Sequence, residues 1–294
     1  MTTAISILPD QQLAALNEAY GKAVARRRLR FALSSAVFCA ALIVAAIGAD
    51  VNLRTLFTYF GHFVSYFDRL LTLDSGGRVW TDIPEWLWGW RKWSLLLGET
   101  ILISYVGTTS GAAVGFALSF LAAENTSPAP WLRFAVKRSM EFCRTVPDIV
   151  FALIFVIAFG LGPMAGVLAL MIHSIGALGK QYAEMVENID MKPVESVRST
   201  GAGWISRMRF AVLPQVVAGF ASYTLLRFEI NVRSASVMGF VGAGGIGLEL
   251  ITAIRKFYYS DVSAILLMII LTVFVIDIGT GWIRGHLFGG ERRT

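Results

Sequence analysis

Five polar residues interrupt an otherwise apolar stretch near residue 230, and they could bind an anion. They are Arg227, Glu229, Asn231, Arg233 and Ser234. If this stretch is a helix, a rotation of about 100° per residue places Arg227, Asn231 and Ser234 on one face. A guanidinium group stays charged and binds phosphate-like oxygens in pairs, so we expect Arg227 and Asn231 to contact an anionic ligand. Glu229 and Arg233 are four residues apart on roughly the opposite face, which predicts an internal ion pair.

Other motifs lack the residues that their chemistry would need. Gly242-Ala-Gly-Gly-Ile-Gly247 has the spacing of a dinucleotide-binding loop, but no βαβ unit surrounds it. Gly176 to Lys180 faintly resembles a phosphate loop, yet Gln181 stands where Ser or Thr would bind magnesium. His173-Ser174 has no obvious second histidine or carboxylate to orient it. We therefore expect no catalytic residue, metal or cofactor in this chain, and either a polar contact within the bundle or a substrate contact for His173.

The composition places the chain in a membrane. Hydrophobic residues make up 55% of the 294 and charged residues only 16%, which is too apolar for a water-soluble domain of this length. Several apolar runs approach the roughly 20 residues that cross a bilayer as a helix, and alternating strands are absent. We predict an all-α, polytopic membrane protein with about six transmembrane helices. The net charge of +6 reflects basic residues in loops between spans rather than a nucleic-acid surface.

The first third of the chain divides at its charged residues. Residues 1–30 are predicted to form a cytoplasmic segment with a short amphipathic helix, and residues 31–49 a first span with its basic flank inside. Residues 50–93 mix charges of both signs with tryptophans, which are typical of the headgroup interface, and predict an external loop with interfacial helices. Residues 94–294 hold the remaining spans.

Five further apolar runs predict those spans, and the basic residues between them place both ends of the chain in the cytoplasm. Gly107, Gly111 and Gly115 in the first run would let another helix approach closely. A break at Gly160-Leu-Gly-Pro163 divides one block into two short arms, whose helices we expect to start before Pro147 or to lie in a protein-lined bundle. The runs are residues 95–122, the two arms within 148–179, 210–232 and 261–283.

A glycine-rich connection, residues 233–257, separates the last two spans and is expected to be irregular. Irregular backbone is tolerated at membrane depth only where protein or a water-filled cavity surrounds it. This break could act as a hinge and an apolar gate, although core packing explains its apolar residues equally well. The candidates are Met238, Phe240, Gly242, Gly244, Gly245 and Gly247.

The most polar stretch between apolar runs, residues 184–214, contains Glu195-Ser-Val-Arg-Ser-Thr-Gly201 followed by Leu213-Pro214. This pattern resembles the E-A-A-x-x-x-G motif, with its downstream I-x-L-P, that marks permease subunits of binding-protein-dependent ABC importers. Glu195, Gly201, Leu213 and Pro214 keep both identity and spacing. The commonest letters of the motif are replaced at Ser196, Val197 and Ala211.

A second resemblance narrows the family. The run from Arg227 to Gly247, together with Arg144-Thr-Val-Pro147 and Gly160-Leu-Gly-Pro163, is similar to the phosphonate-importer branch, whose permease fold is methionine-importer-like. The similarity covers roughly residue 95 to the C-terminus.

The resemblance implies a permease subunit that works with partners. These would be a second copy of the chain, two cytoplasmic ATPase subunits that bind ATP and magnesium, and an external phosphonate-binding protein. A short helix ending at Gly201 would lodge in a groove on the ATPase and transmit its closure. The residues expected for this coupling are Glu195, Arg198, Gly201, Gly203, Leu213 and Pro214. Those expected along the substrate path are Arg227, Asn231, Arg233, Ser234 and His173.

We therefore predict an ATP-driven importer of phosphonate or a related phosphorus oxyanion, located in the cell inner or plasma membrane. The same permease fold could instead serve another small solute such as phosphite or methionine. A self-sufficient secondary transporter is an alternative from another class, but no internal repeat is evident. A membrane-embedded enzyme is a third, and it lacks any paired catalytic motif.

Overall fold

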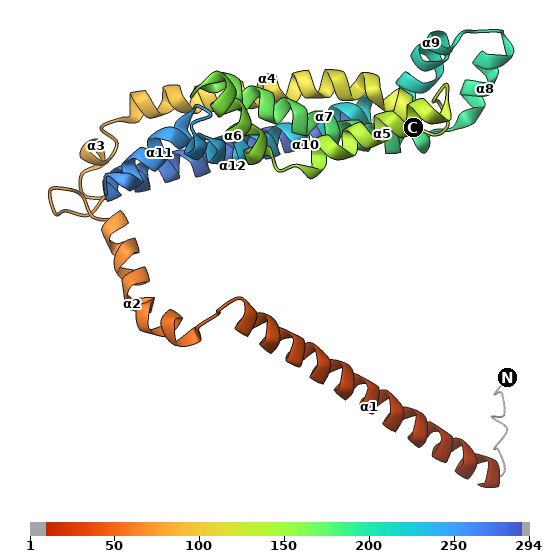
Figure 1. Ribbon diagram of the computed structural model, residues 1–294, viewed down its shortest axis with the longest axis horizontal. Coiled ribbons are helices and arrows are strands. Elements are labelled where there is room, and N and C mark those ends of the chain that lie inside the picture. Colours follow the sequence, from red (N-terminus) through yellow and green to blue (C-terminus); the bar gives the residue numbers. More distant parts are fainter. Residues whose placement is uncertain (1–9, 290–294) are drawn as a thin grey trace, which may run out of the picture. The chain divides into compact units, whose positions relative to one another are not determined.

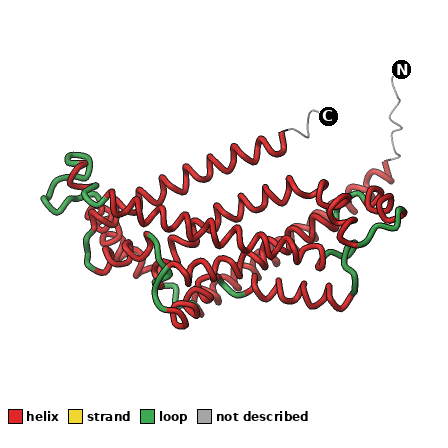
Figure 2. Tube along the Cα trace, turned by 90° about the horizontal axis from the view of Figure 1, so that it is seen from above, coloured by secondary structure: helices red, strands yellow, loops and turns green. Residues whose placement is uncertain are grey.

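The computed structural model describes residues 10–289, and this part of the chain is helical and contains no strands (Figure 1, Figure 2). The chain divides into two compact units, residues 1–65 and residues 66–294. Five helices of the described residues are long and apolar enough to cross a membrane, and counting one bent pair as a single span gives six. The predicted all-α, polytopic membrane protein is confirmed.

The first unit is dominated by α1, Asp10–Gly48, which is one continuous helix. The expected division into a short amphipathic helix and a span starting at residue 31 is therefore wrong. Arginine and leucine are good helix formers and no proline intervenes, so the helix runs unbroken through Arg26-Arg-Arg-Leu-Arg30. Its candidate span is Glu18–Gly48. Residues 1–9 of the predicted cytoplasmic segment lie outside the described residues.

The second unit is a helix bundle in which α4, α7, α10 and α12 run side by side (Figure 1). The preceding helix α2, Leu53–Leu70, runs across the boundary between the units. The bundle elements are α3 (Ile83–Trp86), α4 (Trp90–Ala122), α5 (Pro130–Thr145), α6 (Asp148–Phe159), α7 (Pro163–Glu187), α8 (Met191–Ser199), α9 (Trp204–Arg207), the π-helix η1 (Met208–Val212), α10 (Leu213–Met238), the 3₁₀-helix η2 (Gly239–Val241), α11 (Ile246–Arg255) and α12 (Tyr259–Gly289).

The tryptophans around α3 connect it to the bundle. The indole N–H of Trp86 donates to Ser263 Oγ at 2.9 Å, and that of Trp88 donates to Asp261 Oδ1 at 2.8 Å. Trp93 is only 1% exposed and packs within the bundle core. The interpretation of these tryptophans as headgroup contacts is therefore wrong for Trp93, because α12 covers the start of α4.

Three glycines of α4 pack directly on α7, as their spacing predicts. A Cβ atom on Gly107 would lie 2.7 Å from Leu170 Cβ, and one on Gly111 would lie 2.6 Å from Ser174 Cβ. At Gly115 the nearest atom would be the backbone N of Gly179, at 3.0 Å. Without side chains at these positions, the two helices approach nearly backbone to backbone, which is a common basis of helix packing in membranes.

The predicted hairpin is present, but its first arm is bent. Helix α6 has 12 residues, or about 18 Å at 1.5 Å per residue, so it is too short for a hydrocarbon core of about 30 Å. It meets α5 at Pro147 with a bend of 85°, and a helix therefore does start before Pro147. Gly160 and Gly162, with φ of +89° and +147°, form the turn into α7 in a conformation that glycine adopts easily.

The glycine-rich connection is more helical than expected. Helix α10 continues to Met238, and α11 follows after a short break at Gly242–Gly245. The prediction that residues 233–257 are irregular is therefore correct only near that break. Gly247 on α11 allows α11 to pack closely on α10, because a Cβ at this position would collide with the Ser236 carbonyl oxygen on α10.

We predict that Gly111→Ala lowers the free energy of unfolding by about 1–3 kcal/mol, the usual effect of overpacking. The added methyl group has no room against Ser174 and the Met171 carbonyl oxygen, at 2.6 and 2.8 Å. Gly98→Ala on the same helix is the matched control, since a Cβ there meets nothing within 4 Å. Thermal unfolding of both variants in detergent tests this, and equal melting temperatures would contradict it.

Candidate functional site

The polar segment over residues 184–214 contains the short helices α8, α9 and η1, and α8 and α9 lie at one end of the bundle (Figure 1). Helix α8 begins after Asp190, whose Oδ1 accepts a backbone N–H of the first turn at 3.0 Å. Its inner face buries Val194, while Glu195 and Arg198 are exposed. Among the described residues neither of these two charged side chains has a hydrogen-bond or ion-pair partner. The helix therefore presents two opposite charges outward.

Gly201 ends this helix in the left-handed region, with φ of +79°. This confirms the helix end that the motif predicts, because glycine adopts this conformation without the strain a Cβ would bring. Gly203 has φ of −65°, which any residue can adopt. Leu213 and Pro214 form the start of α10. Proline has no backbone N–H, but the first N–H groups of a helix have no partner within that helix, so proline costs little stability there.

The Gln215 side chain ties α8 to α10. Its Oε1 accepts from Asp190 N at 3.1 Å, and its Nε2 donates to Asp190 O at 3.2 Å and to Ala211 O at 2.7 Å. On the other side, Trp204 Nε1 donates to Thr126 O at 2.7 Å and secures α9. No sequence pattern selects Gln215, because a single glutamine in a polar stretch has no signature of its own.

A buried polar junction joins α4, α7 and α10 in the middle of the bundle. Asn231 is 0% exposed, and its Nδ2 donates to Thr108 Oγ1 and to Ser174 Oγ, both at 2.8 Å. Arg227 Nε donates to the same Ser174 oxygen at 3.4 Å, and Ser104 Oγ donates to Asn231 O at 3.2 Å. The prediction that Arg227 and Asn231 share a face is confirmed. Sequence reasoning missed Thr108 and Ser104, since hydroxyls on small-residue helices are common.

The remaining predicted path residues lie around this junction without joining it. Arg233 forms an ion pair with Glu229, as the spacing predicts. Ser234 is half-buried. His173 precedes Ser174 on α7, and its Nδ1 lies 3.2 Å from Val146 O, at the bend between α5 and α6. His173 therefore makes a polar contact within the bundle, one of its two expected roles.

The candidate hinge is fixed to its neighbours. Gly242, Gly244 and Gly245 all have positive φ, between +75° and +87°. The N–H of Gly245 donates to Glu99 Oε1 at 3.4 Å, and the first N–H of α11 donates to Thr100 Oγ1 at 2.9 Å. These contacts satisfy N–H groups that a helix start leaves without partners.

The two apolar gate candidates differ in exposure. Met238 is 1% exposed and belongs to the core, whereas Phe240 is 39% exposed. Gly162 N donates to Gly242 O at 2.9 Å, so the turn before α7 contacts the break before α11. A gate at this position stays a prediction.

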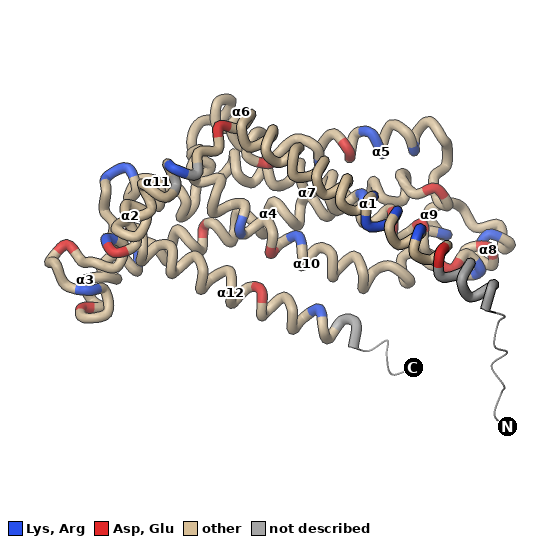
Figure 3. Tube along the Cα trace, turned by 90° about the horizontal axis from the view of Figure 1, so that it is seen from below, with Lys and Arg blue, Asp and Glu red and all other residues tan. Residues whose placement is uncertain are grey.

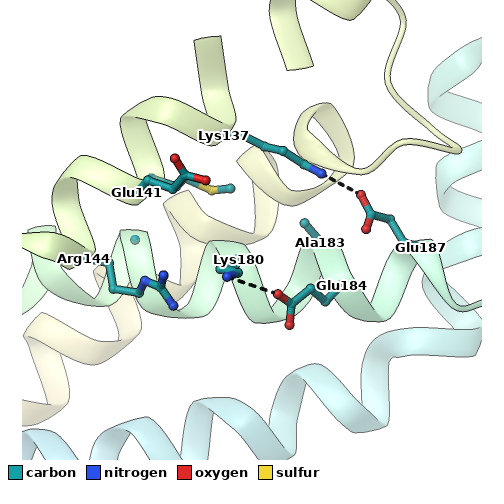
Figure 4. Close-up of a pocket in the computed structure, with 9 residues that line it drawn as sticks. Lys137, Glu141, Arg144, Lys180, Ala183, Glu184 and Glu187 are labelled. Carbon is teal, nitrogen blue, oxygen red and sulfur yellow. Dashed lines mark hydrogen bonds and ion pairs between the residues drawn. The ribbon is translucent and has the colours of Figure 1, made fainter. Parts of the chain in front are cut away.

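A pocket of about 260 Å³ lies between α5 and α7 (Figure 4). Its charges largely pair with one another: Lys137 Nζ lies 3.0 Å from Glu187 Oε1, and Lys180 Nζ lies 3.5 Å from Glu184 Oε1. Arg144 also lines it, from the C-terminal end of α5. Because acidic and basic side chains balance, this pocket has no net positive charge to attract an anion.

We predict that Ser174→Ala destabilises the bundle by about 1–3 kcal/mol, because it leaves the buried Asn231 amide without one of its acceptors. Ser110→Ala is the matched control, since that hydroxyl bonds only carbonyl groups of its own helix, at 2.6 and 3.3 Å. Thermal unfolding in detergent compares the two. Similar losses in both variants would show that the junction does not depend on Ser174.

Comparisons with known proteins show which transport components the chain is similar to. Residues 115–290 match the family model described as binding-protein-dependent transport system inner membrane component. The phosphite transport system permease protein PtxC of Stutzerimonas stutzeri is 41% identical over 198 residues, which cover 67% of this chain and 72% of PtxC. The phosphate-import permease protein PhnE of Mycolicibacterium smegmatis is 44% identical over 179 residues, which cover 61% of this chain and 34% of PhnE.

Among solved structures, an inward-facing form of the MetNI methionine ABC transporter has a similar chain. The TM-score is 0.57 at 19% identity, over 66% of this chain and 95% of that chain. At this identity the likeness concerns the fold alone.

Proposed function

The chain belongs to the family of binding-protein-dependent transport system inner membrane components, and we propose that it is the permease subunit of an ATP-driven importer for phosphonate or a related phosphorus oxyanion. The observation that carries the proposal is α8, a short helix ended by left-handed Gly201 that directs Glu195 and Arg198 outward without partners in the described chain. Such a helix suits docking into a groove on a separate ATPase.

The proposed assembly contains two copies of this chain, two cytoplasmic ATPase subunits that bind ATP and magnesium, and an external solute-binding protein. Both ends of the chain and α8 would then lie on the cytoplasmic side. The permeases PtxC and PhnE are named for phosphite and phosphate. These names support a phosphorus oxyanion as the substrate class.

Movement of α8 reaches α10 through Gln215. When the ATPase dimer closes on ATP, α8 moves with its groove, and the two bonds between Gln215 and Asp190 carry that motion to the first turn of α10. Between about three and five helical turns further on, at 3.6 residues per turn, α10 carries Arg227 and Asn231. The force is thus delivered to the polar junction.

An anion can reach this junction only in a different conformation. Asn231 is wholly buried, and both of its amide hydrogens already bond Thr108 and Ser174. Separation of α7 from α10 would break the hydrogen bonds that Asn231 and Arg227 both donate to Ser174. Alternating access supplies such a separation, in which the anion replaces the Ser174 hydroxyl as the hydrogen-bond acceptor.

ATPase stimulation of the reconstituted complex with its binding protein tests the function. We expect phosphonate, phosphite or phosphate to stimulate hydrolysis, and methionine to leave it unchanged. Arg227→Ala should weaken the apparent affinity for the active oxyanion about tenfold or more, because a charge-assisted hydrogen bond contributes about 1.5–3 kcal/mol. Arg28→Ala on α1 is the control. Stimulation by methionine alone would overturn the substrate class, and normal affinity in Arg227→Ala would remove that residue from the path.

Coupling has its own test. We expect Glu195→Lys to lower transport while the ATPase still hydrolyses ATP, because the reversed charge disrupts docking of α8. Gly201→Val should do the same, since a β-branched residue is strained at φ of +79°. Gly98→Val on α4 is the matched control: a Cβ at either glycine meets nothing within 4 Å, and of the two only Gly201 has positive φ. Transport and hydrolysis that stay in proportion in Glu195→Lys and Gly201→Val would refute this role of α8.

A further inference from the structure

A groove of about 470 Å³ runs between α10 and α12 and combines charges with apolar side chains. Glu229 and Arg233 line it from α10, and Ile270, Phe274 and Asp277 line it from α12. Figure 3 shows acidic and basic positions on both helices where they run side by side. Ile270 and Phe274 are 63% and 59% exposed, so this face has no cover within the chain's own second unit.

The charges of the groove are incompletely paired. Glu229 forms ion pairs with both Arg233 and Arg284, the second at 3.8 Å. Two arginines thus share one carboxylate, and the Arg233 side chain remains 54% exposed. Asp277 is exposed, and its carboxylate has no hydrogen-bond or ion-pair partner among the described residues. Arg233 therefore has only a shared ion-pair partner among the described residues, and Asp277 has none.

Asp277 lies at a depth where lipid cannot satisfy it. The candidate span Tyr259–His286 has 28 residues, and Asp277 is about 7 Å from its midpoint at 1.5 Å per residue. The hydrocarbon core extends about 15 Å on either side of its centre. Ionisable groups at such depth face protein or water rather than lipid tails.

We propose that this groove is an interface with a second copy of the same chain. A two-fold axis through the groove would place Asp277 of each copy against Arg233 of the other. The interface would then contain two symmetry-related Asp277–Arg233 ion pairs. Phe274 and Ile270 would be covered by the same contact. The apolar part of α1, residues 31–49, carries no charged residue and cannot complement Asp277 in this way.

The surface of α12 beyond the groove also suits a second helix. Gly281 and Gly285 follow Asp277 at intervals of four residues, and a Cβ at either glycine would meet nothing within 4 Å. Small residues spaced in this way let two membrane helices approach closely. The inference rests on the proposed function only in requiring that two copies assemble.

Cross-linking between two differently tagged copies tests the interface. Cys39→Ser and Cys143→Ser remove both native cysteines, and one copy then carries Asp277→Cys while the other carries Arg233→Cys. In membranes that contain the assembled ATPase complex, we expect a short bismaleimide to join the two tags. Leu102→Cys, exposed on α4, is the matched control and should not cross-link.

Phe274→Cys in both copies gives a second measurement that keeps all the groove charges, and it should form a symmetric cross-link. If the cysteines at these positions react with maleimide but no cross-link forms between the two tagged copies, the proposal is wrong. Rapid labelling of Asp277→Cys by a membrane-impermeant maleimide would overturn it too, because the groove would then face water. Neither readout needs ATP or substrate, so failure here is distinct from failure of the oxyanion panel.

Discussion

A polar group buried among membrane-spanning helices has to find its partner within the protein, because lipid offers none. The junction around Asn231 shows what this constraint produces, since its amide bonds hydroxyl groups from both α4 and α7. The close approach of α4 and α7 at Gly111 brings Ser174 within reach. Small residues and polar side chains therefore act together: the glycines set the distance between the helices, and the hydrogen bonds fix their register.

The same bundle links an exposed helix to its interior. Helix α8 contacts the rest of the protein through the Gln215 bonds to Asp190 and through Met191, Val194 and Val197, which pack on the core. In the proposed transporter it would move as a unit with the ATPase that binds its outer face. Helix α10 would then receive that motion at its first turn and carry it to the polar junction. In the proposed transporter, chemical energy released by a partner thus acts on groups that hold substrate.

Much of the fold followed from apolar runs and turn residues, and the failures have identifiable causes. Gly201 was predicted as a helix end, and its left-handed conformation confirms this. The pair Glu229–Arg233 also follows from local spacing. The break expected between the N-terminal helix and the first span is missing, because a charge cluster changes solvation but does not interrupt helical hydrogen bonds. Pro147 is a local signal for the break between α5 and α6, but the angle of 85° is a tertiary property, because both helices pack on α7.

By itself, the sequence determined the membrane setting, the order of the helices and the motif on α8, since hydrophobicity, helix period and turn chemistry act over a few neighbouring residues. It also placed Arg227 and Asn231 on one face of a helix. Only the tertiary structure decided that Asn231 is buried against Thr108 and Ser174, and that Gln215 holds Asp190. Those contacts join residues from 25 to 123 positions apart, and their partners are chosen by how the helices pack, a property of the whole bundle rather than of any segment.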